Sequence, residues 1–277
     1  MCCNMKHSLN LPLHSMSAIM KYPLFLFCIL CLLCGCSNKQ KGHAPSANVA
    51  EDSLHADNST EDAGCVKTAV PSAPAKSRTA RYLDSLGFVN IAEADSSIAI
   101  ELMYTHADNF TGEVLYEDLQ EAYLHPDAME SLSEAQRLLK ELHPGYSLIV
   151  YDAARPMSVQ QKMWDVVKGT PKYIYVSNPS RGGGLHNYGL AVDTSILDET
   201  RTPLPMGTPV DYLGKEAHIT AEAQLVAQGK ITEQERENRQ LLRRVMREAG
   251  FRPLPSEWWH FNRYGRQTAR EKYRVIP

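Results

Sequence analysis

The sequence has no cysteine after Cys65, and this absence limits how the rest of the chain can be held together. Its seven cysteines all lie at or before residue 65, and six of them precede residue 37. The part that follows therefore has neither a disulfide framework nor a thiolate metal site. A metal ion bound there must be held by histidine, aspartate or glutamate.

An excess of positive charge is also absent, and so is a long apolar run. The net charge is −3 and the pI is about 6.4, which argues against nucleic acid as a partner. Residues 23–34 form the main apolar run, which is too short to span a bilayer comfortably, because a spanning helix needs about 20 apolar residues. Preceded by Lys21, the run is typical of the core of a signal peptide. We predict a signal peptide over residues 1–35, with Met20 as the natural start.

The apolar run ends in the sequence Leu-Cys-Gly-Cys at residues 33–36, which resembles the cleavage box of bacterial lipoproteins. The resemblance implies cleavage before Cys36 and acylation of its thiol and new amino terminus; more than one acyl chain gives stable membrane anchoring. The alternative is an ordinary secretory signal or a membrane anchor. Residues 36–79 contain almost no large apolar side chains, which predicts a flexible tether. We therefore expect an exported lipoprotein, anchored to the membrane and facing the periplasm.

From residue 80 onward the sequence has the pattern of a folded domain, predicted to cover residues 80–277. Apolar residues at helical spacing predict helices at residues 126–142 and 232–249, and a short helix is expected at 80–86. Ser158 is expected to be the N-cap of a helix that runs through Val167. Runs of β-prone residues predict strands at 98–104, 146–151 and 190–195. Helices and strands come in separate runs, without steady alternation and without an internal repeat. This pattern favours an α+β fold over a doubly wound parallel sheet.

A histidine and an aspartate frame a short β-prone segment in the middle of this domain. His186 lies in a glycine-rich loop, and Asp193 follows the apolar residues 190–192. The two side chains can converge on one point, because Gly189 lets the backbone turn tightly between them. By itself the pair could also be a polar loop residue and an unrelated acid on a strand.

A second pair, Glu257 and His260, flanks Trp258 and Trp259. On an ideal strand the acid and the histidine would face opposite sides, so a bulge or bend is needed for both to reach one metal. The tryptophans would exclude water and raise the pKa of the acid toward the working pH. An aromatic core segment with a chance acid and histidine is the alternative. Added to the first pair, these residues complete the inventory of a catalytic zinc site: three N/O ligands, an open position for water and a base.

The two stretches resemble the D-alanyl-D-alanine dipeptidase (VanX-type) family, which belongs with the zinc D-Ala-D-Ala carboxypeptidases and shares a fold with the hedgehog signalling domain. Further matches occur in the same order and approximate spacing, at Tyr104 with residues 109–112, at residues 151–156 and at residues 205–211. The resemblance covers residues 85–277. It implies a single hedgehog/DD-peptidase-like α+β domain, with a mainly antiparallel sheet flanked by helices.

Carried over by position, the resemblance implies that one zinc ion per chain is bound by His186, Asp193 and His260. Glu257 matches the residue that serves as general base and acid. Arg155 matches the residue that stabilises the oxyanion of the tetrahedral intermediate. A permanently charged, rigid guanidinium suits that role.

The resemblance also implies how the substrate is held. Asp211 matches the acid that binds the free amino group of the substrate, and Tyr104 matches a tyrosine near the same end. A carboxylate facing that amine rejects longer peptides, whose nitrogen at this point is an amide. For Arg155, a structural salt bridge with Asp152 is the alternative to a catalytic role.

One position departs from the family pattern. Two residues before the first histidine the family commonly has serine or threonine, in contact with the substrate carboxylate, and here the residue is Gly184. The carboxylate end of the substrate-binding site, and the preference for a second D-alanine, therefore depend on other groups. Arg181 or backbone N–H groups of the loop are candidates.

The sequence thus predicts a zinc-dependent dipeptidase that hydrolyses D-Ala-D-Ala or a related small dipeptide outside the cytoplasm. A D,D-carboxypeptidase acting on peptidoglycan stem peptides is the alternative within enzymes; Asp211 argues against it and the exported location argues for it. A zinc-stabilised binding module without catalysis is the alternative outside enzymes. Such a module would need neither Glu257 nor Arg155.

Overall fold

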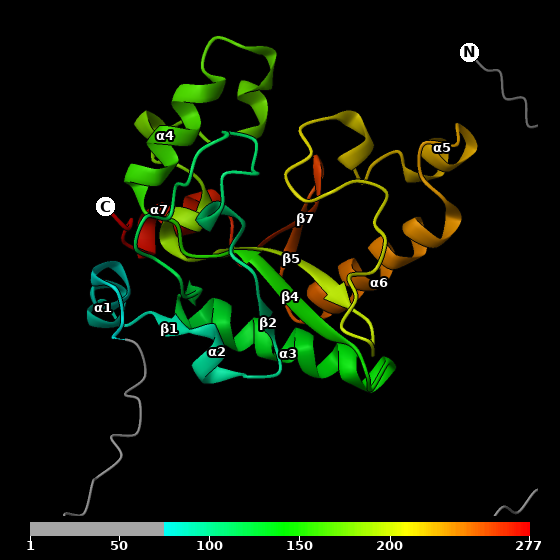
Figure 1. Cartoon of the computed structure of the whole chain (residues 1–277), viewed down its shortest axis with the longest axis horizontal. Coiled ribbons are helices and arrows are strands. Elements are labelled where there is room, and N and C mark those ends of the chain that lie inside the picture. The colour runs from blue at the N-terminus through cyan, green and yellow to red at the C-terminus, as the bar shows by residue number, and fades with distance from the viewer. Residues whose placement is uncertain (1–74) are drawn as a thin grey trace, which may run out of the picture. The chain divides into compact units, whose positions relative to one another are not determined.

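A mixed five-stranded sheet organises the part of the chain that the computed structural model describes, residues 75–277 (Figure 1). The strands lie in the order β2–β4–β5–β7–β6, with bounds β2 Ala99–Ile100, β4 Ser147–Asp152, β5 Ala191–Leu197, β6 Arg252–Leu254 and β7 Glu257–Asn262. β2 runs parallel to β4, and the other pairings in this sheet are antiparallel. The expected α+β fold with a mainly antiparallel sheet is confirmed at this level, and the hedgehog-like topology stays a prediction.

The N-terminal predictions concern residues that the structure does not describe. The signal peptide, the acylation site Cys36 and nearly all of the tether lie outside residues 75–277. They stay predictions. Within residues 75–277, no helix combines the length and the apolar character needed to cross a membrane.

Helices α3 (Pro126–Leu142) and α6 (Glu233–Glu248) pack against each other and against the sheet. α3 begins with Pro126 at its first turn, where a missing N–H costs nothing. α6 begins with a capping box between Thr232 and Glu235, and Gly250, with φ 92°, follows its C-terminus. Both helices were predicted from their apolar periodicity, and both are confirmed.

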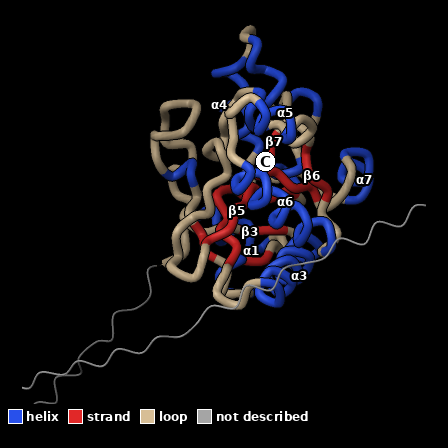
Figure 2. Tube along the Cα trace, turned by 90° about the vertical axis from the view of Figure 1, so that its right-hand side faces the viewer, coloured by secondary structure: helices blue, strands red, loops and turns tan. Residues whose placement is uncertain are grey.

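The remaining elements are short, and they surround the central strands together with long loops (Figure 2). The helices are α1 Arg78–Ser85, α2 Ile91–Ala94, α4 Met157–Val167, α5 Glu222–Ala227 and α7 Arg266–Lys272. A separate antiparallel pair joins β1 Val89–Asn90 to β3 Tyr123–Leu124. The 3₁₀ turns are η1 Met103–Thr105, η2 Pro171–Tyr175, η3 Pro179–Arg181, η4 Leu185–Tyr188 and η5 Lys215–Ala217.

Two predicted elements differ from the observed ones. The strand expected over residues 98–104 is reduced to β2, because the chain turns into η1 and carries the Tyr104 side chain into the interior. The carbonyl of Tyr104 there accepts hydrogen bonds from the backbone N–H groups of Leu115 and Tyr116, at 3.0 and 2.9 Å. Ser158 is not the N-cap of α4. The helix already begins at Met157, whose N–H donates to the carbonyl of Ile276 at 2.9 Å.

Candidate active site

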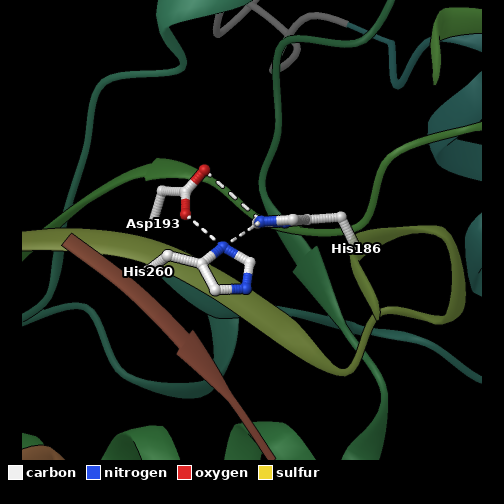
Figure 3. A group of neighbouring side chains, drawn as sticks. All are labelled: His186, Asp193 and His260. Carbon is white, nitrogen blue, oxygen red and sulfur yellow. Dashed lines mark hydrogen bonds and ion pairs between the residues drawn. The ribbon is translucent and has the colours of Figure 1, made fainter. Parts of the chain in front are cut away.

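Three side chains from separate elements meet at one buried point (Figure 3). Asp193 on β5 lies directly opposite His260 on β7 in the antiparallel register, so both side chains leave the same face of the sheet. His186 comes from η4, which ends at Gly189 with φ 63°. A Cβ at position 189 would lie 2.3 Å from the ring of Phe88, so only glycine fits this turn.

The ligand atoms of the three residues lie close enough to share one metal ion. Asp193 Oδ1 is 2.9 Å from His260 Nδ1, and Asp193 Oδ2 is 3.3 Å from His186 Nε2. The two imidazole nitrogens, His186 Nε2 and His260 Nδ1, are 3.1 Å apart. All three residues are buried. The sequence prediction that these side chains converge is confirmed.

The outer nitrogens of both imidazoles are engaged by other acceptors. His186 Nδ1 lies 2.7 Å from the carbonyl oxygen of Ala153, which can only accept, so this nitrogen carries the proton. His260 Nε2 lies 2.9 Å from Asn262 Oδ1. The inner nitrogens are then left with free lone pairs that face Asp193. This outer hydrogen bonding is the usual device that orients metal-binding histidines, and the cluster could hold a metal ion.

Glu257 lies beside this cluster because β7 is irregular. In β6, Pro253 pairs with Phe261 and the next residue, Leu254, pairs with Glu257. One step along β6 therefore corresponds to four residues of β7, so the register shifts and β7 is irregular between Glu257 and Phe261. This irregularity brings Glu257 Oε2 to 3.9 Å from His260 Nδ1. The predicted bend is confirmed.

Burial raises the pKa of the Glu257 carboxyl to about 7, from an ordinary value of 4.5. The direction agrees with the sequence prediction, but the tryptophans act differently from what was expected. Trp258 and Trp259 are buried in the core and do not line the cavity at the site. Trp258 Nε1 instead donates to Thr208 Oγ1 at 2.8 Å and so anchors the loop that carries Asp211.

Arg155 lies at the same site, in the turn between β4 and α4. Its Nε donates to Asp152 Oδ2 at 2.9 Å, and its Nη1 donates to Gln160 Oε1 at 3.0 Å. Its Nη2 lies 3.9 Å from Asp193 Oδ2. Burial is the largest single influence and opposes the charge, but Asp152, Tyr104, Tyr116 and Asp193 together outweigh it and raise the pKa of the guanidinium further above its usual range. The structure thus contains the salt bridge between Arg155 and Asp152, and this pairing fixes the guanidinium in the lining of the cavity.

Asp211 and Tyr104 form a pair at another part of the site. The Tyr104 hydroxyl donates to Asp211 Oδ2. Asp211 has φ 63°, a backbone conformation that is uncommon outside glycine and that concentrates at functional positions. Burial raises the pKa of its carboxyl to about 7. Residues 104 and 211, far apart in the chain, are thus brought together as the sequence motifs suggested.

All the predicted side chains and Gly184 line a single cavity of about 120 Å³. Pockets for drug-sized ligands usually measure about 300–1,000 Å³, so this cavity suits a small ligand. Arg181 does not line it and lies on a neighbouring surface hollow instead. Five further polar lining residues lie outside the sequence motifs, which gave no signal for them: Gln160, Tyr175, Ser177, Asn262 and Arg266.

The two buried acids make the stability of the metal-free protein depend on pH. Asp211 and Glu257 have ordinary pKa values of 3.8 and 4.5 and values of about 7 in the fold. Between about pH 4 and pH 7, the two carboxyl groups therefore bind more protons in the folded state than in the unfolded chain. The stability that they contribute is complete below about pH 4 and is lost as the pH rises toward 7, with a slope of up to about 1.4 kcal/mol per pH unit for each acid.

Thermal unfolding in the presence of a chelator, from pH 5 to pH 8, tests this expectation. The double variant Asp211→Asn, Glu257→Gln should lose less stability over this range than the wild type. The exposed pair Asp165→Asn, Glu271→Gln is the matched control and should follow the wild type. Equal slopes for the wild type and the buried double variant would contradict the raised pKa values.

Comparison with known proteins identifies a matching family and several similar proteins. The family described as D-ala-D-ala dipeptidase matches residues 84–276. The D-alanyl-D-alanine dipeptidase of Escherichia coli (strain K12) is 31% identical over 178 residues, which cover 64% of this chain and 85% of that protein. The D-alanyl-D-alanine dipeptidase of Enterococcus faecium is 26% identical over 193 residues, which cover 64% of this chain and 91% of that protein.

Proposed function

The chain belongs to the D-ala-D-ala dipeptidase family of peptidases, and we propose that it is a zinc-dependent dipeptidase acting on D-Ala-D-Ala or a related small dipeptide. The observation that carries the proposal is the convergence of one possible metal site, one acid and one amine-binding carboxylate on a single small cavity. The sequence resemblance to this family is confirmed.

Zinc suits the donor set of His186, Asp193 and His260. Catalytic zinc sites commonly have three protein ligands of this kind and keep a fourth position open. Ligand atoms about 2.0–2.1 Å from a tetrahedral ion lie about 3.3 Å from one another. The two imidazole nitrogens lie 3.1 Å apart, which agrees with this spacing. Each of them also lies near one Asp193 oxygen, His260 Nδ1 at 2.9 Å from Oδ1 and His186 Nε2 at 3.3 Å from Oδ2. When bound, zinc would polarise the scissile carbonyl and lower the pKa of a water molecule.

The side chains around the ligands then have separate tasks. Glu257 takes the proton from the attacking water and returns it to the leaving amine, a role that its buried position beside the proposed ligands allows. Arg155 donates hydrogen bonds to the carbonyl oxygen as negative charge develops on it. Because Asp152 and Gln160 already fix the guanidinium, little reorganisation accompanies the reaction.

Asp211 and Tyr104 favour a dipeptide over a longer peptide. The ammonium group of a free dipeptide can pair with the Asp211 carboxylate, and the Tyr104 hydroxyl fixes that carboxylate. In a longer peptide an uncharged amide nitrogen occupies the same place and leaves the buried carboxylate without a cation. This mismatch costs free energy, since an unpaired buried charge is unfavourable.

The test is hydrolysis by the purified zinc-loaded protein of D-Ala-D-Ala, N-acetyl-D-Ala-D-Ala, L-Ala-L-Ala and a pentapeptide ending in D-Ala-D-Ala. We expect cleavage of free D-Ala-D-Ala and poor cleavage of the acetylated and longer peptides. Asp211→Asn should lower kcat/KM for the free dipeptide about 10²-fold, because it removes the partner of a buried charge. It should change the acetylated substrate little.

Asp165→Asn, an exposed change on α4, is the matched control and should retain wild-type activity. Cleavage of the pentapeptide without cleavage of the dipeptide would show a D,D-carboxypeptidase and contradict the proposal. If Asp211→Asn lost activity equally on D-Ala-D-Ala and on N-acetyl-D-Ala-D-Ala, the amine-binding role of Asp211 would be contradicted, but the dipeptidase function would not.

A further inference from the structure

Position 184, for which the family resemblance leads us to expect serine or threonine, is glycine in this chain, and the side chain of Ser177 lies next to it. Gly184 has φ −104°, which any residue adopts, so the backbone does not require glycine here. A Cβ at position 184 would lie 3.1 Å from Ser177 Oγ and 3.3 Å from Ser177 Cβ. The Ser177 hydroxyl therefore lies beside the point from which a side chain on residue 184 would extend.

The backbone of Ser177 is connected by hydrogen bonds to Arg155 through the side chain of Gln160. Its carbonyl accepts a hydrogen bond from Gln160 Nε2 at 2.9 Å. The other atom of the same amide, Gln160 Oε1, accepts from Arg155 Nη1 at 3.0 Å. Gln160 is almost fully buried, with 1% of its surface exposed. One rigid amide thus links the backbone of Ser177 to the guanidinium expected to face the scissile carbonyl.

Arg266, the first residue of α7, adds a positive charge beside Ser177. Its Nη2 donates to Ser177 Oγ at 3.3 Å, and the residue lines the cavity. Among residues 75–277, no carboxylate oxygen lies within 4.0 Å of this guanidinium. An arginine has five N–H donors, so most of the donors of Arg266 are left for a ligand. Arg155 differs, because its guanidinium already has a carboxylate partner in Asp152.

The residues that line the cavity therefore include groups of opposite charge. Asp211 supplies a carboxylate, and Arg266 supplies a guanidinium next to the Ser177 hydroxyl. A free dipeptide has an ammonium group at one end and a carboxylate at the other, with the scissile carbonyl between them. A cavity that offers both charges is complementary in charge to such a molecule, which favours its binding.

We propose that Arg266 and the Ser177 hydroxyl bind the C-terminal carboxylate of the dipeptide, in place of the side chain missing at Gly184. The carboxylate accepts a charge-assisted hydrogen bond from the guanidinium and a second bond from the hydroxyl. Arg181, expected from the sequence as a substitute, lies outside the cavity. This inference rests on the proposed dipeptidase function, and it adds that the enzyme selects a free C-terminal carboxylate.

The first experiment compares D-Ala-D-Ala with its C-terminal amide, which lacks the negative charge. Arg266→Gln should lower kcat/KM for the free acid about 10–100-fold, the usual effect of losing one hydrogen bond to a charged group. It should leave kcat/KM for the amide nearly unchanged, so the preference for the acid disappears. The control Arg274→Ala removes the same charge from an exposed residue outside the cavity and should behave as the wild type.

The second experiment removes the hydroxyl group from position 177 and then places one at position 184. Ser177→Ala should lower kcat/KM for the free acid several-fold. The double variant Ser177→Gly, Gly184→Ser removes the atoms that crowd a Cβ at position 184 and should regain activity toward the acid. Melting temperatures of all variants show whether the fold is kept.

The outcomes separate this inference from the function on which it rests. If the zinc-loaded wild type cleaves neither compound, the proposed function fails and this inference with it. If the wild type prefers the acid and Arg266→Gln keeps that preference, the carboxylate site is wrong while the dipeptidase function stands. An equal loss on acid and amide in Arg266→Gln would likewise overturn the carboxylate site.

Discussion

Glu257→Gln is expected to lower kcat by about 10²–10⁴-fold while the protein retains one zinc ion per chain. Glutamine keeps the shape of the side chain but cannot accept the proton of the attacking water. Zinc should stay because Glu257 is not one of the three converging ligands; its nearest carboxylate oxygen lies 3.9 Å from His260 Nδ1. Activity on D-Ala-D-Ala and metal content by elemental analysis are the two measurements.

His186→Ala is compared with Glu257→Gln in the same assays, to distinguish loss of the metal from loss of the base. It removes one of the three ligands and should lose both zinc and turnover. Glu271→Gln, an exposed change on α7, and His106→Ala, an exposed histidine, are the matched controls and should keep both. Full zinc retention by His186→Ala would refute the ligand assignment, and normal turnover by Glu257→Gln would refute the assignment of the base.

Arg155→Lys is expected to lower kcat by about 10²–10³-fold, with a much smaller change in KM. Lysine keeps the positive charge but lacks the planar set of donors, so it cannot both pair with Asp152 and donate to the developing oxyanion. A loss in kcat with little change in KM is the sign of an interaction made mainly in the transition state.

The choice of lysine matters, because alanine would test a different property. Arg155→Ala would leave Asp152 as a buried charge without its cation, which costs about 3–5 kcal/mol of stability. Melting temperature must therefore be measured beside the kinetics. Arg137→Lys, on the exposed face of α3, is the matched control. If Arg155→Lys loses stability but keeps kcat, Arg155 has only the structural role that its salt bridge with Asp152 suggests.

The longer helices were predictable because their local signals agree with their packing. In α3 the buried residues Met129, Leu132 and Leu139 recur at helical spacing, and Pro126 marks the start. The start of α4 was misplaced, since the hydrogen bond from Met157 to Ile276 joins segments far apart in the chain. Rules for N-caps use only neighbouring residues, so they could not predict a hydrogen bond to Ile276.

The site divides in the same way. The residue types and their order predicted the group of possible metal ligands, the acid Glu257 and the proposed amine-binding Asp211, because metal binding and proton transfer demand particular side chains. The carboxylate-binding residues proposed here, Ser177 and Arg266, had no motif, because a hydroxyl and a guanidinium can be supplied from any segment that folds into place.

The sequence by itself determined the family, the chemistry of the predicted ligands and the longer helices, since these depend on side-chain identity and on local periodicity. Only the tertiary structure decided that Asp193 stands opposite His260 and that the irregular β7 turns Glu257 toward them. Strand register and bulges are set by contacts between distant segments, and the order of residues along the chain does not state those contacts.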